Sequence, residues 1–218
     1  MVQYLERSVI STDWITLVIM GCILLLAFTK YAYPKRFQEF IQLPITNKYF
    51  LIHGKNDRIE HPFNLLLFVF QVLSFSLLIY LLIKTYDSTI ALKNKWLYVQ
   101  IVTVYSVFIG VKFSIEKIVG SIFSIDSLVN QYLYQKLSYR NLLAILVLII
   151  NSIFLYTLAP SLHLLLGFVG ILIVFNGIAL FYSYKTNGNL IFSHFFYFIL
   201  YLCALEISPY IIVYKTIT

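Results

Sequence analysis

Six apolar segments, each long enough to cross a lipid bilayer, divide this chain of 218 residues. A membrane-spanning helix needs about 20 consecutive apolar residues. The segments are residues 14–33, 63–83, 96–118, 141–159, 161–184 and 190–214. Only 11% of the residues are charged, whereas soluble domains have about 25%. The sequence therefore excludes a water-soluble domain. It predicts an all-α polytopic membrane protein in which residues 1–218 form one integral membrane domain.

The connection at residues 34–62 is expected to lie on the membrane surface. Phe37, Phe40 and Ile41 recur at helical spacing, with charged side chains between and around them. This pattern predicts a short amphipathic helix at the interface, ended by Pro44.

A second amphipathic segment is predicted within residues 112–140. The apolar stripe of the span at 96–118 continues beyond that span, and residues 124–138 then show helical spacing of their own. We expect this second surface helix to be separate from the span that begins at residue 141. Lys112 is expected to pair with Glu116 one helical turn later.

The distribution of Lys and Arg gives the topology. Cytoplasmic loops collect these residues, and eleven of the sixteen fall on one side of the membrane if both termini lie outside the cytoplasm. The same bias accounts for the net charge of +7, so nucleic acid is not expected as a partner. The two amphipathic segments then lie together on the cytoplasmic face and offer a surface for a partner.

Glu206 is an ionisable side chain inside the last apolar segment, where a charge costs about 3 kcal/mol and by default marks a functional or paired group. At 1.5 Å per residue it lies about 24 Å from the cytoplasmic end, in the outer half of the membrane. Pro209 removes the N–H that would bond the Leu205 carbonyl, which predicts a helix kink beside the carboxylate. Tyr210, one turn after Glu206, is placed to donate a hydrogen bond to it.

The topology brings three more polar side chains, Gln100, Asn151 and His163, to the same outer layer. With Glu206 and Tyr210 they form the predicted intramembrane polar site. Three hypotheses for the Glu206 carboxyl remain open. It is a structural group that ties helices together, a proton-carrying group that titrates near neutrality, or a contact to another subunit or a lipid.

Three glycines, Gly167, Gly170 and Gly177, lie on one face of the segment at 161–184. Small residues let helix backbones approach closely in membranes. We therefore expect this face to pack against another helix.

The C-terminal run Leu200–Pro209, closing with Tyr214 and Lys215, resembles the signature of a known family. It is a family of small multi-pass membrane proteins of Bacteroidota, the domain of unknown function numbered forty-two seventy-one. Residues 61–64 with Gln71, and residues 112–141, are also similar to that family, so the resemblance covers residues 45–218. It implies a multi-pass protein of a bacterial inner membrane, with both termini periplasmic by the topology above. It implies no activity, cofactor or catalytic residue.

Recognised motifs of catalysis and metal binding do not occur in the sequence. The sequence contains no metalloprotease, nucleophile-elbow or phosphate-loop motif, so we expect no enzyme. His53 and His61, with Asp57 and Glu60 between them, match no recognised metal-ligand spacing, so neither a metal nor a cofactor is predicted.

A non-enzymatic subunit or assembly factor of a cell-envelope complex, of the secretion or gliding type, is the function that we expect from these features. Its partners would be membrane lipids and other membrane protein subunits, with no soluble substrate. The alternative is a small proton-coupled transporter or channel that uses Glu206.

Overall fold

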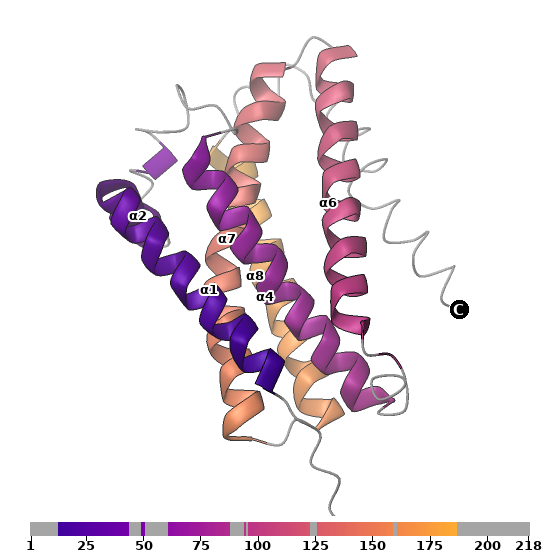
Figure 1. Ribbon diagram of the computed structural model, residues 1–218. Coiled ribbons are helices and arrows are strands. Elements are labelled where there is room, and N and C mark those ends of the chain that lie inside the picture. Colours follow the sequence, from indigo (N-terminus) through magenta and orange to yellow (C-terminus); the bar gives the residue numbers. More distant parts are fainter. Residues whose placement is uncertain are drawn as a thin grey trace, which may run out of the picture.

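The computed structural model describes residues 13–43, 49–50, 61–87, 94, 96–122, 126–158 and 161–186. Helices and turns, and no strand, occur in these ranges, which confirms the all-α prediction for this part of the chain. The helices are α1 (Asp13–Ala32), α2 (Pro34–Ile41), α4 (Pro62–Tyr86), α6 (Leu97–Ile122), α7 (Asp126–Tyr156) and α8 (Leu162–Thr186). The long helices run side by side, and the short α2 turns away from the end of α1 (Figure 1).

Among the described residues, four helices are long and apolar enough to cross a membrane. They are α1, α4, α6 and the part of α7 from Val129 to Tyr156. In α8, the stretch Leu162–Ile178 is a shorter apolar helix. Many large apolar side chains of α1, α6 and α8 face outward, as expected of a surface in contact with lipid. The length of these helices and their apolar outer surface are those of a membrane protein. The predicted segment at 190–214 lies outside the described residues.

Prolines set the starts of two helices. Pro34 and Pro62 occupy the first turns of α2 and α4, where a missing N–H costs no hydrogen bond. Before α4, the Nδ1 atom of His61 accepts a hydrogen bond from the Phe63 N–H at 3.2 Å and so caps the helix.

α7 corrects one prediction. The amphipathic helix at 124–138 and the span at 141–159 were expected to be separate, but α7 continues without a break from Asp126 to Tyr156. Neither Gly nor Pro occurs between these two residues, so nothing in the backbone interrupts the helix. The polar side chains Ser138 and Asn141 lie at the expected boundary, and both are buried within the bundle.

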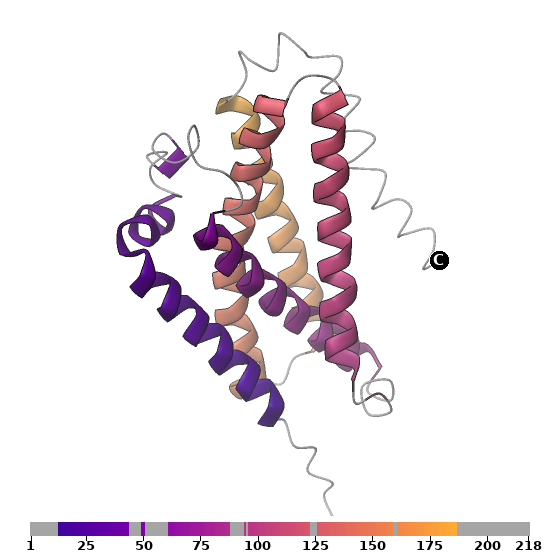
Figure 2. The same cartoon turned by 45° about the horizontal axis from the view of Figure 1, so that its top comes forward.

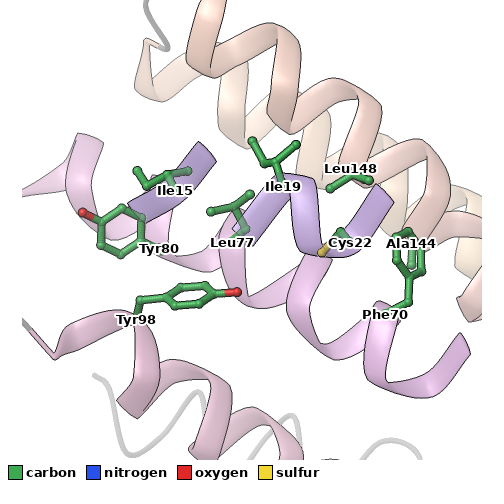
Figure 3. Packing of buried hydrophobic residues seen from close by; sticks show 9 residues of the cluster. All are labelled: Ile15, Ile19, Cys22, Phe70, Leu77, Tyr80, Tyr98, Ala144 and Leu148. Atoms are coloured by element: carbon green, nitrogen blue, oxygen red, sulfur yellow. The ribbon is translucent and has the colours of Figure 1, made fainter. Parts of the chain in front are cut away.

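The central helix is α4, which contacts α1, α6, α7 and α8. It crosses between α1 and α6, with α7 and α8 behind it (Figure 2). One core cluster joins α1, α4, α6 and α7 through side chains that include Ile19, Leu77, Tyr98 and Leu148 (Figure 3). Close packing of this kind holds helices together in lipid, where apolar burial gives little advantage.

Candidate functional site: a buried polar layer in the bundle

Polar side chains of α4 lie in the middle of the bundle. Gln71, Ser74 and Ser76 are all fully buried. α4 has neighbours on several sides, and these three side chains point toward them and not toward the exposed side that carries Leu65 and Val69. A buried polar group is costly unless it is hydrogen-bonded, so these three side chains define a candidate functional layer.

Asn151 of α7 joins this layer. Its Nδ2 atom donates a hydrogen bond of 3.0 Å to the backbone carbonyl of Ser74, and the side chain has no exposed surface. From the other side, the Cys22 side chain of α1 approaches the Ser74 side chain. The layer therefore connects α1, α4 and α7 at one level.

Several buried polar atoms of the layer have no hydrogen-bond partner among the described residues. They are both amide atoms of Gln71, the hydroxyls of Ser74 and Ser76, and the Oδ1 atom of Asn151. Most buried polar atoms in proteins are paired, so an exception calls for an explanation, such as a functional role. The layer can accept and donate hydrogen bonds to a further polar group.

The three described members of the predicted polar site lie apart in the structure. Asn151 is buried, but Gln100 is exposed and its Oε1 atom accepts a bond of 2.8 Å from Asn94 near the start of α6. His163 is exposed in the first turn of α8. No contact within the described ranges joins these three side chains. Glu206, Pro209 and Tyr210 lie outside the described residues.

The glycine face of α8 is open. Gly167, Gly170 and Gly177 are exposed, and a Cβ atom added at any of them would meet no described atom within 4 Å. The expected packing partner is thus not among the described helices. A close helix approach occurs instead at Gly120 of α6, where an added Cβ would lie 3.0 Å from Val129 of α7.

A buried ion pair joins α6 to α7. The Nζ atom of Lys136 donates to Oε1 of Glu116 at 2.9 Å, and the side chains are 8% and 2% exposed. Lys136 also lies over the Tyr132 ring, with its Nζ atom 5.4 Å from the ring centre. Sequence reasoning had expected Lys112 as the partner of Glu116. Glu116 lies six residues before the end of α6 and Lys136 ten residues after the start of α7, so the pairing depends on how the two helices pack and left no local signal in the sequence.

The two predicted amphipathic segments contact each other. Tyr134 of the second donates a hydrogen bond of 2.8 Å to the hydroxyl of Tyr49 of the first, and both are buried. Burial raises the pKa of the Tyr49 phenol, and its hydrogen bond with Tyr134 opposes the rise only in part. Nearby, the Arg36 guanidinium lies 5.7 Å from the centre of the Phe63 ring. These contacts fix the segment after α1 against α4 and α7.

Long apolar helices with buried polar side chains between them define a helical membrane protein. The chain belongs to the family described as Domain of unknown function (DUF4271), whose model matches residues 15–217. The match begins thirty residues before the expected resemblance at 45–218, so α1 and α2 are parts of the family domain as well. No curated protein and no solved structure matches the chain.

Proposed function

We propose that this protein is a non-enzymatic subunit or assembly factor of a cell-envelope complex in a bacterial inner membrane. The open glycine face of α8 is the observation that supports this proposal. Gly167, Gly170 and Gly177 present a smooth surface on which an added Cβ would meet no described atom within 4 Å, and small residues in membranes are typical of helix–helix interfaces.

The proposed topology has six spans and two periplasmic termini, as the Lys and Arg distribution predicts. In the structure, the start of α1 and the end of α7 lie at one end of the bundle (Figure 1). α2 and the first turn of α7 lie at the other end. Arg36, Lys117 and Lys136 belong to that second end, which suits a cytoplasmic side.

Affinity purification in mild detergent tests the proposal. We expect the wild-type protein to recover a stoichiometric membrane protein partner. Gly170→Leu should remove it, because a bulky side chain blocks close helix approach. Gly110→Leu is the matched control, since Gly110 of α6 is equally open and exposed. A solitary wild-type monomer, or equal recovery by both variants, would contradict the proposal.

The buried polar layer favours a second candidate, a small proton-coupled transporter or channel. Gln71, Ser76 and Asn151 carry polar atoms without a described partner inside an apolar bundle, and Glu206 would supply the proton-carrying group. The test is proton uptake by proteoliposomes under a pH gradient. Uptake by the wild type and none by Glu206→Gln would support this function, and no uptake by the wild type would exclude it.

A further inference from the structure

Helices α4, α7 and α8 surround a partly open groove of about 220 Å³. Its walls are mostly apolar and come from all three helices, with Phe75, Leu143 and Leu172 among them. Two polar side chains interrupt this lining, Arg140 of α7 and Asn176 of α8. The groove thus combines a long apolar wall with one cation and one amide.

Arg140 is fixed at the edge of this groove. Its Nη2 atom donates a hydrogen bond of 3.2 Å to the hydroxyl of Tyr105 on α6. The Tyr105 ring in turn stacks on Phe75, with ring centres 6.2 Å apart and an angle of 28° between the rings. Tyr105 and Phe75 therefore hold the guanidinium on the side of the molecule where the groove lies.

The position of Arg140 along α7 places it inside or close to the apolar part of the membrane. Sixteen residues separate it from the end of the helix at Tyr156, which is about 24 Å at 1.5 Å per residue. The hydrocarbon core is about 30 Å thick. A cation at this depth is costly and is usually paired. Within the described residues, the hydroxyl of Tyr105 is the one hydrogen-bond partner of the guanidinium.

We propose that this groove binds a lipid with an anionic head group. Arg140 binds the head group, because a guanidinium presents paired N–H groups that match phosphate or carboxylate oxygens. The amide of Asn176 offers a second donor, and one acyl chain lies along the apolar wall that includes Leu143 and Leu172. Basic pockets between membrane helices on the cytoplasmic side are typical sites for anionic head groups. This site is independent of the partner interface proposed for the glycine face.

Native mass spectrometry of the full-length protein tests the proposal. The protein is incubated with equal amounts of phosphatidylglycerol and phosphatidylethanolamine that carry the same acyl chains. We expect the wild type to retain phosphatidylglycerol about tenfold more than phosphatidylethanolamine, as expected for one charge-assisted contact, and Arg140→Gln to lose this preference. Lys30→Gln should keep it, because Lys30 is an exposed cation near the same end of the bundle but outside the groove.

A second pair of variants tests the apolar wall without changing any charge. Ile173 lines the mouth of the groove and is 66% exposed, whereas its neighbour Val174 is 61% exposed and does not line it. Ile173→Trp should reduce phosphatidylglycerol retention about tenfold, and Val174→Trp should not. Because both positions are exposed, the two variants keep the test valid if Arg140→Gln fails to fold.

Three results would overturn the proposal. The first is a wild type without preference for the anionic lipid. The second is equal retention by wild type and Arg140→Gln. The third is equal retention by Ile173→Trp and Val174→Trp, which would place the acyl chain outside the groove. An added arm with oleate distinguishes a carboxylate head group from a phosphodiester, and binding of either lipid through Arg140 supports the site.

Discussion

Replacing Glu116 by glutamine removes the negative charge that faces Lys136 across the contact between α6 and α7. The two atoms are 2.9 Å apart, and the side chains are almost completely buried. At an effective dielectric constant of about 20, two unit charges at this distance attract by about 6 kcal/mol, and burial of both charges costs much of that gain. Loss of one partner leaves the other charge buried and unpaired. We therefore expect Glu116→Gln to lower the free energy of unfolding by about 3–5 kcal/mol.

A double-mutant cycle measures the contribution of the pair itself. Lys136→Met should cost a similar amount, but the double variant should be far more stable than the sum of the two losses predicts, because it leaves no unpaired charge. Unfolding by sodium dodecyl sulfate in mixed micelles gives the free energies. Lys117→Met is the matched control, an exposed cation beside Glu116 that should change the stability by about 0.5 kcal/mol or less. A loss of under about 1 kcal/mol in Glu116→Gln, or additive losses in the double variant, would refute the argument.

Three further changes give expected outcomes in the same unfolding assay. Gly120→Ala should destabilise the fold by about 1–3 kcal/mol because the added Cβ meets α7 at 3.0 Å. Gly110→Ala should be neutral or stabilising, because its added Cβ meets no described atom within 4 Å. Equal effects of the two substitutions would contradict this prediction. Gln71→Leu should raise the stability by about 1–2 kcal/mol because both buried amide atoms lack a described partner, and a loss of stability would show that the amide is paired. Because the pKa of Tyr49 is raised, its contribution to the stability of the fold is fully present below about pH 10, the pKa of an unperturbed tyrosine. That contribution is lost as the pH rises further. The alkaline loss of stability should be shallower in Tyr49→Phe, and identical pH profiles would oppose this.

The starts of the helices were predictable because their signals are local. The apolar stretch that contains α1 and the proline at the start of α4 are visible in any short window of the sequence. The continuity of α7 was not predictable from such signals. Ser138 and Asn141 have the polarity of a surface boundary, and their burial comes from neighbouring helices that are distant in the sequence.

For the candidate site, the sequence indicated that a polar residue such as Asn151 matters, but it did not indicate the hydrogen-bond partner of that residue. Asn151, like Gln100 and His163, was selected as a polar side chain that the predicted topology places at the depth of Glu206. Its partner is the backbone carbonyl of Ser74, and a carbonyl is present at every residue, so it leaves no trace in the sequence. Gln100 and His163 were placed by depth alone, which says nothing about the direction in which a helical side chain points.

The continuous α7 makes the two ends of this protein mechanically dependent on each other. Its 31 residues measure about 46 Å at 1.5 Å per residue, and the hydrocarbon layer takes up about 30 Å of that length when the helix stands upright. The rest is a stiff lever outside the bilayer, held at Tyr134 by Tyr49. A partner that binds this part of α7 and tilts it would also move Asn151, because both belong to one uninterrupted helix. Binding at the membrane surface would therefore affect the interior of the bundle.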